Sequence, residues 1–127
     1  MNKPIDILQK WIDGINSADT EKLINLYDEK AVLIPTFSNR ILDTKEKIRE
    51  YFEKVGNKEQ LSISLHDNTV ITQEIQPHIF AITGIYNWCF AIDGELFNFE
   101  ARFSYLIDLL KESPIINHHS SQIPRTL

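Results

Sequence analysis

The feature that most constrains the fold is a pair of long strand-like segments, residues 78–92 and 96–110, with Asp93-Gly94 between them. Asp-Gly between two apolar runs is a strong signal for a tight turn, because glycine readily adopts the positive φ angles that such turns need. The two segments therefore predict a long antiparallel hairpin. A further apolar segment, residues 115–121, follows a short polar break and predicts a strand that closes the sheet.

The first half of the chain has helical periodicity instead. Residues 4–15 carry apolar side chains three and four positions apart, which predicts an amphipathic helix with proline in its first turn. Asp19 can cap a second, short helix. A third helix is predicted between a capping pattern at Asp43 and a stop at Gly56.

Shorter strands are predicted at residues 31–36 and 61–65, the second continuing at residues 70–71 after a kink. The order is helix, helix, strand, helix and then four strands. Helices that precede a run of antiparallel strands are typical of the α+β class, with the helices covering one face of the sheet. We predict one domain that spans residues 1–127.

Composition excludes several classes of function. The chain has 43% hydrophobic residues and a net charge of −5, with no stripe of lysine or arginine, so we predict binding neither to nucleic acid nor to a membrane. No uninterrupted apolar stretch is long enough to span a bilayer, and we expect a cytoplasmic protein. The single cysteine, Cys89, excludes an internal disulfide and is expected to be a buried, inert thiol.

The two faces of the long hairpin differ in chemistry. Alternate positions are strongly aromatic on one face, including Tyr86, Trp88, Phe90, Phe103 and Tyr105. Such a face is too apolar to leave in water, so we expect a second subunit to cover it and form a homodimer. The alternative is a deeper core within one chain. The other face mixes small, polar and charged side chains, which suits a ligand cavity between the sheet and its helices.

Several short motifs occur together along the chain. They are Trp11, Leu26-Tyr27-Asp28, residues 31–39, Tyr51-Phe52, Gly84-Ile85-Tyr86, residues 101–105, His118-His119-Ser120-Ser121 and Pro124. On these residues the chain is similar to nuclear transport factor 2-like (SnoaL-like) proteins and, more narrowly, to the association domain of calcium/calmodulin-dependent protein kinase II and its stand-alone bacterial relatives.

The resemblance implies a cystatin-like fold, in which a curved antiparallel sheet forms a cone around a long N-terminal helix. In that association domain a strand with the pattern Glu-x-Arg lines a deep pocket, and Glu100 and Arg102 match this pattern. A terminal histidine of that pocket corresponds to His119, whereas Asn87 stands where the kinase has a second pocket arginine. The pocket implied here is therefore less positively charged. The chain is too short for a kinase domain and has no Gly-rich loop, so no kinase activity is expected.

Arg102 is the leading candidate for ligand binding, because a guanidinium binds a carboxylate or phosphate through two hydrogen bonds. The alternative is a structural ion pair with Glu100 or Asp28. His119 could be a pocket donor, a general base or a structural histidine. Asp28, beside Tyr27, could be a proton-transfer acid in an apolar pocket or a salt-bridged acid.

The remaining predicted pocket residues, which would supply polar contacts and the pocket wall, are Asn87, Ser104, Tyr27, Trp11 and Tyr51. Because His118 and His119 are adjacent in a strand, they point to opposite faces and cannot readily share a metal. His66 and His78 have no ligand spacing, so we predict no metal site. We also predict no cofactor.

The favoured function is a dimeric association domain with a pocket for a small, partly apolar and anionic ligand. The alternative is a small-molecule isomerase, lyase or cyclase of the SnoaL-like or ketosteroid-isomerase type, with Asp28 or His119 moving a proton. A third possibility is an assembly domain whose pocket is vestigial.

Overall fold

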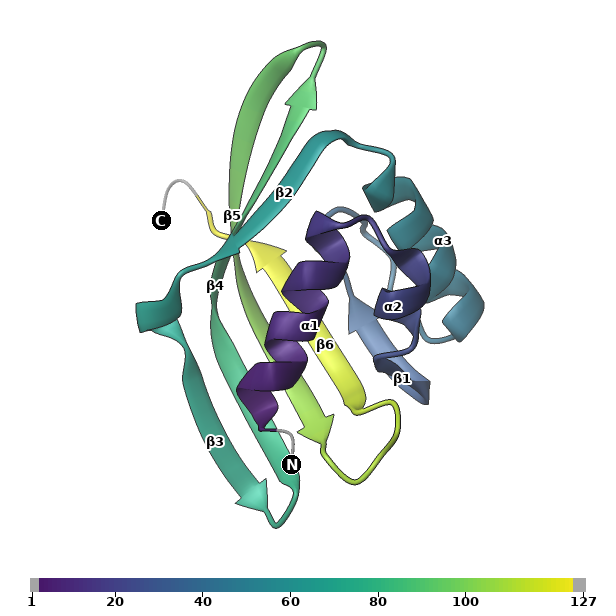
Figure 1. Ribbon diagram of the computed structural model, residues 1–127, viewed down its shortest axis with the longest axis vertical. Helices are drawn as coiled ribbons and strands as arrows, with labels where there is room; N and C mark the ends of the chain where they lie inside the picture. Colours follow the sequence, from purple (N-terminus) through teal and green to yellow (C-terminus); the bar gives the residue numbers. More distant parts are fainter. Residues whose placement is uncertain (1–2, 125–127) are drawn as a thin grey trace.

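The structure is a computed structural model that describes residues 3–124 (Figure 1). Its helices are α1 (Pro4–Asn16), α2 (Thr20–Ile24) and α3 (Lys45–Gly56), with one short 3-10 turn, η1 (Asp67–Thr69). Its strands are β1 (Tyr27–Ile34), β2 (Glu59–Leu65), β3 (Ile71–Gln76), β4 (Ile79–Ile92), β5 (Glu95–Asp108) and β6 (Ile115–Gln122). The α+β class and the order of helices and strands predicted from the sequence are confirmed.

The strands form one sheet in the order β1-β6-β5-β4-β2, and β3 pairs with β4 beyond the end of β2. The long β4–β5 hairpin is paired along its whole length, from Ile79 opposite Asp108 to Ile92 opposite Glu95. Turn η1 separates β2 from β3, so these two strands are one edge with the kink that the sequence predicts.

One pairing differs from the antiparallel sheet that the sequence predicts. Strand β1 runs parallel to β6, with Val32 opposite Asn117 and Ile34 opposite His119. Parallel neighbours need a long connection, because the chain must return to the same end of the sheet. Here α3 and strands β2 to β5 all lie between β1 and β6 in the sequence, and they supply that connection.

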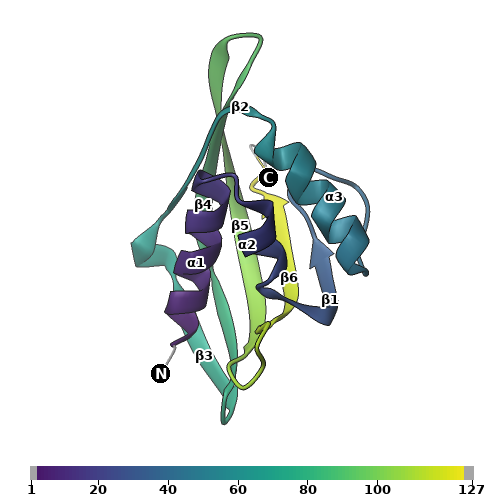
Figure 2. The same ribbon diagram turned by 45° about the vertical axis from the view of Figure 1, so that its right-hand side comes forward.

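The three helices lie against one face of the curved sheet (Figures 1 and 2). Helix α1 presents buried apolar residues to the sheet, among them Leu8, Trp11 and Ile15. Thr44 begins α3, where its hydroxyl accepts a hydrogen bond from the Lys47 backbone N–H at 3.2 Å. The cap is one residue later than the sequence predicts.

The five aromatic residues assigned to a dimer interface lie instead in the core of one chain. The side chains of Tyr86, Trp88, Phe90, Phe103 and Tyr105 are each at most 4% exposed. They face the helices, and the ring of Tyr86 stacks on that of Trp11 with centroids 5.3 Å apart. The predicted location of the interface is therefore wrong, since the helices already cover this face. The alternative of a deeper core within one chain describes it correctly.

Candidate functional site

The predicted pocket residues divide between the two faces of the sheet. Arg102, Ser104 and His119 lie on the outer face, opposite the helices, where they border an open hollow of about 240 Å³. Asn87 and Glu100 lie opposite each other in the β4–β5 register and share this outer face.

Trp11, Tyr27 and Tyr51, by contrast, lie on the helix side. Trp11 and Tyr27 are fully buried in the core, and Tyr51 packs against Phe52 of the same helix. The strands that separate the two groups mean that no single cavity contains all the predicted pocket residues. The two candidate catalytic residues, Asp28 and His119, are likewise apart.

The acidic residues that could have paired with Arg102 have other partners. A Glu100 carboxylate oxygen lies 3.5 Å from His66 Nε2, and Asp28 lies 3.4 Å from Lys111 Nζ in the turn after β5. A backbone hydrogen bond from Lys30, together with Lys111, lowers the pKa of Asp28. Asp28 is therefore an ionised, salt-bridged acid, and its geometry does not favour proton transfer in an apolar pocket.

Replacing Arg102 with alanine is expected to change the free energy of unfolding by no more than about 0.5 kcal/mol, because its side chain is exposed and is without an ion pair among residues 3–124. Urea denaturation of the two proteins measures this difference. A loss of about 2 kcal/mol would instead indicate a structural role for the guanidinium.

The core contains a chain of hydrogen bonds centred on His118, a residue for which the sequence predicts no role in the pocket or in catalysis. Trp11 Nε1 donates to the Tyr27 hydroxyl at 3.0 Å, and this hydroxyl lies 2.7 Å from His118 Nδ1. On the other side of the ring, His118 Nε2 lies 3.2 Å from the Tyr86 hydroxyl, which donates to Ser120 Oγ at 2.7 Å.

These bonds define one consistent direction. Because Tyr86 donates its one proton to Ser120, its oxygen accepts from His118 Nε2, which therefore carries a proton. In a neutral imidazole Nδ1 then has no proton, and it accepts from the Tyr27 hydroxyl. Ser120 continues the chain to the hydroxyl of Thr36. Every group in this network acts as a neutral donor or acceptor.

Burial keeps the network neutral. Desolvation, with a smaller contribution from His119, holds the pKa of His118 well below its ordinary value. Desolvation also raises the pKa of the Tyr27 and Tyr86 hydroxyls. The surrounding side chains leave no room for a water molecule. Among residues 3–124, the interior of the cone around Tyr86 and His118 is therefore a packed core.

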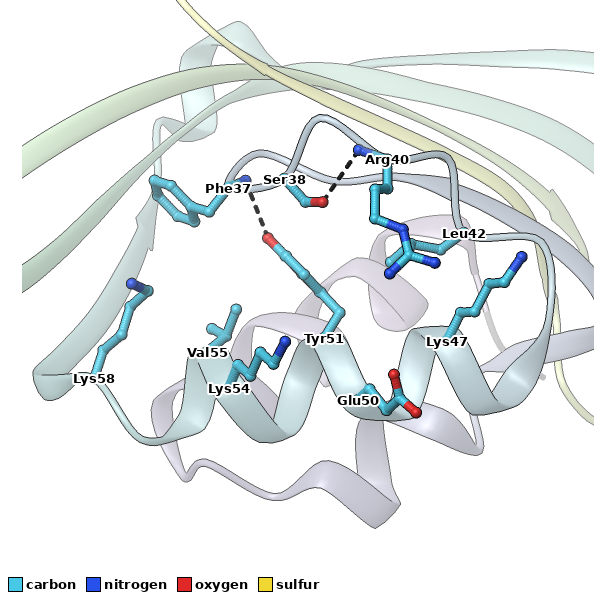
Figure 3. A pocket seen from close by; sticks show the side chains of 10 residues that line it. All are labelled: Phe37, Ser38, Arg40, Leu42, Lys47, Glu50, Tyr51, Lys54, Val55 and Lys58. Carbon is cyan, nitrogen blue, oxygen red and sulfur yellow. Dashed lines mark hydrogen bonds between the residues drawn. The ribbon is translucent and has the colours of Figure 1, made fainter.

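A separate cleft of about 270 Å³ lies between α3 and the loop of residues 35–44 (Figure 3). Its cationic residues are Arg40, Lys47, Lys54 and Lys58, and its one carboxylate is Glu50. Its remaining wall is formed by Phe37, Ser38, Leu42, Tyr51 and Val55. Tyr51 is the one predicted pocket residue that borders it.

The sequence contains a signal for this cleft, which is the spacing of polar residues on the predicted third helix. Lys47, Glu50, Tyr51 and Lys54 are spaced three, four and seven apart, which places them on one face of a helix. Arg40 could not be added from spacing, because the path of its loop brings it over that face.

Two absences concern only the part of the chain that the structure describes. Among residues 3–124, no group of three or more His, Cys, Asp or Glu side chains could hold a metal ion. No helix in the same range is both long enough and apolar enough to cross a membrane.

The curved sheet with helices on one face defines a protein of the cystatin-like, nuclear transport factor 2-like class. Within this class, the chain belongs to the family described as calcium/calmodulin dependent protein kinase II association domain, whose model matches residues 2–124. The resemblance inferred from the sequence motifs is thus confirmed. A search of curated proteins found no match.

Solved structures with the same fold come from several bacteria. One from Xanthomonas campestris, named for the kinase II association domain, has a TM-score of 0.85 at 24% identity, covering 96% of this chain and 86% of that one. A Caulobacter vibrioides protein with a cystatin-like fold has a TM-score of 0.78 at 11% identity, with coverages of 95% and 87%. A Streptomyces avermitilis protein, named as a dehydratase of the NTF2-like family, has a TM-score of 0.78 at 13% identity, with coverages of 93% and 92%. At these identities the matches establish the fold alone.

Proposed function

We propose that this protein is a non-catalytic association domain whose copies pair through the outer face of the sheet. The observation that carries the proposal is that all three helices lie on the other face (Figure 2). Along the outer face, Ala81, Ile85 and Leu106 are only half-buried, and Ile71 at the edge is 61% exposed. Apolar side chains that a single chain leaves partly in water gain stability when a second sheet covers them.

The outer face also contains the polar groups that give an interface its specificity. Arg102, Ser104 and His119 lie next to these apolar residues, and His119 Nε2 is 2.8 Å from Ser121 Oγ. Protein interfaces usually combine apolar side chains with polar groups that form hydrogen bonds. The membership of an association-domain family agrees with this use of the face.

Replacing both Ile85 and Leu106 with aspartate is expected to convert a dimer into a monomer. Each side chain points away from the helices, so the change places charges in the interface while leaving the core intact. Light scattering should give twice the 14.8 kDa mass of the chain for wild type and 14.8 kDa for the double variant.

The matched control replaces an apolar residue on another surface, Ile5 on α1, which is 39% exposed, with aspartate. Wild type and this control should have the same mass. A monomeric wild type, or a folded Ile85→Asp, Leu106→Asp protein that remains a dimer, would exclude the outer face as the interface.

The second part of the proposal is that the domain binds a small, partly apolar anion. The packed interior of the cone argues against the deep pocket implied by the sequence resemblance. The cationic cleft beside α3 favours binding at the surface instead. The alternative of an isomerase, lyase or cyclase has less support, because Asp28 and His119 lie apart and the hollow beside His119 is open.

A further inference from the structure

We infer that the cleft between α3 and the loop of residues 35–44 is the binding site for a small aromatic or branched apolar compound with a phosphate monoester group. This inference rests on the proposed binding function and gives it a location and a chemical class. It is tested separately from the proposed dimer, because α3, which forms one wall of the cleft, lies on the helix side of the sheet (Figure 1).

The clustering of charge is the first observation. The chain has 13 lysine and arginine residues against 18 aspartate and glutamate residues, so an average surface region would be acidic. The cleft instead brings together four cations and one carboxylate, Glu50. Like charges held close together repel one another and are stabilised by an anion between them. A doubly charged group such as a phosphate monoester suits this excess better than a single carboxylate does.

The four cationic side chains differ in whether another group already holds them. Lys47 Nζ is 2.9 Å from Asp43 Oδ1, and Lys58 Nζ lies 4.3 Å from the centre of the Phe90 ring, which holds it at one end of the cleft. Arg40 and Lys54 have no ion pair among residues 3–124. Figure 3 shows the Arg40 side chain extending from the loop toward α3, where Tyr51 and Lys54 lie. We assign the phosphate to this region, where the guanidinium can donate two parallel hydrogen bonds.

Tyr51 completes the polar side of the site. Its hydroxyl accepts a hydrogen bond from the Phe37 backbone N–H at 3.3 Å, so its own proton is available to a ligand. Burial raises the pKa of this hydroxyl well above its ordinary value, which keeps the proton in place at neutral pH. Tyr51 therefore acts as a neutral donor beside the cations.

The apolar part of the ligand has a matching surface. Phe37, Leu42 and Val55 line the same cleft, and a volume of about 270 Å³ accommodates a compound of roughly one ring plus a phosphate. The Phe37 ring packs edge to face against Trp88, with centroids 5.1 Å apart, so it is a fixed wall. Inorganic phosphate alone would leave the half-buried Phe37 ring in water.

The loop side of the cleft is held in place before any ligand binds. Leu33 and Leu42 exchange two backbone hydrogen bonds of 2.9 Å, and Leu42 is buried. Ser38 Oγ accepts the Arg40 backbone N–H at 3.1 Å, which fixes the backbone that carries the guanidinium. Because the site is formed in advance, binding loses little free energy to ordering of the loop.

The affinity for phenyl phosphate is measured by isothermal titration calorimetry at low and moderate salt. Wild type should bind it more tightly than it binds phenol or inorganic phosphate. The double variant Arg40→Ala, Lys54→Ala should bind at least about tenfold more weakly, since each residue donates charge-assisted hydrogen bonds. Glu50→Gln should bind more tightly, because it removes the one carboxylate that repels the ligand.

The matched control is Lys10→Ala, Lys30→Ala, which removes two exposed positive charges outside the cleft. At moderate salt it should bind phenyl phosphate within about twofold of wild type, because charges outside the cleft are largely screened under that condition. Equal weakening in the control and cleft variants, or unchanged binding in the cleft variant, would overturn the inference. So would the absence of tighter binding in Glu50→Gln.

A further comparison separates this inference from the proposed function. If Arg102→Ala abolishes binding while the cleft double variant retains it, the domain binds an anion on its outer face and only the location is wrong. If wild type binds neither phenyl phosphate nor benzoate, both the location and the proposed binding function fail, and the mass of the Ile85→Asp, Leu106→Asp protein still tests association.

Discussion

Replacing Trp11 with alanine is expected to remove about 3–5 kcal/mol from the free energy of unfolding, the largest effect of any single change that we predict. The side chain is 1% exposed and lies at the centre of the core. Its ring contacts five other rings, with centroid distances between 5.2 Å and 6.4 Å, from Phe52, Tyr86, Trp88, Tyr105 and His118. Because small domains have only about 5–15 kcal/mol of stability in total, the variant should be close to unfolding.

Urea denaturation followed by circular dichroism measures this loss. Gln9→Ala is the control in the same helix, since its side chain is exposed and bonds only to Asp13 at 3.1 Å. We expect that control within about 0.5 kcal/mol of wild type. Trp11→Phe should fall between the two, because it keeps a ring but removes the hydrogen bond to Tyr27. A loss below about 1 kcal/mol for Trp11→Ala would contradict the central position of this ring.

The helices and strands could be predicted from the sequence, but which face of the sheet is buried against the helices could not. Helix ends and strand runs depend on neighbouring residues, such as Asp19, whose side chain accepts the Lys22 backbone N–H at 3.1 Å. Which face of β4 and β5 meets the helices depends on residues far apart in the sequence. Both faces are apolar enough to be buried, so alternation separates them without saying which one α1 covers.

The same ambiguity between the two faces affects the candidate site. A partner subunit on the aromatic face would place Arg102 and His119 in the interior and His118 outside it. In the structure His118 lies opposite Tyr105 on the inner face, and His119 lies opposite Ser104 on the outer face. The two histidines do point to opposite faces, as the alternation of a strand predicts.

The partners in ion pairs could not be predicted from spacing in the sequence either. Glu100 and Arg102 share a face two positions apart, which made them natural partners in the sequence. The partner of Glu100 is His66, which directly precedes η1 and is brought close by the pairing of β2 with β4. Surface pairs of this kind contribute little to stability, so their choice is set by the fold rather than by their own energy.

The buried network around His118 should make the protein less stable in mild acid. The unfolded chain binds a proton at this histidine near its ordinary pKa of 6.5, whereas burial holds the folded pKa well below that value. Below about pH 6.5 the unfolded state therefore binds more protons than the folded state, and acid favours unfolding. The free energy of unfolding should therefore fall as the pH is lowered from 7.5 to 5, with a slope that reaches at most about 1.4 kcal/mol per pH unit.

The geometry explains why the folded state resists protonation. A proton on Nδ1 would face the Tyr27 hydroxyl, which now donates to that nitrogen at 2.7 Å, and the Tyr27 oxygen already accepts from Trp11. Tyr86 lies on the other side of the ring, and the ring of Tyr105 stacks on it at 3.8 Å. No carboxylate among these contacts could neutralise an imidazolium.

Urea denaturation at pH 5.0, 5.5, 6.0, 6.5 and 7.5 tests this expectation. His118→Gln should be less stable throughout but should lose most of the pH dependence, because glutamine does not titrate. His119→Gln, the adjacent residue on the exposed face, should keep it. The lowered pKa values of Glu21, Asp28 and Asp43 act at lower pH, since stability from a carboxylate is lost only below its unfolded pKa of about 4. A wild-type stability that is constant from pH 7.5 to 5, or a slope that disappears in His119→Gln instead, would mean that His118 can be protonated in the folded protein or is not the group responsible.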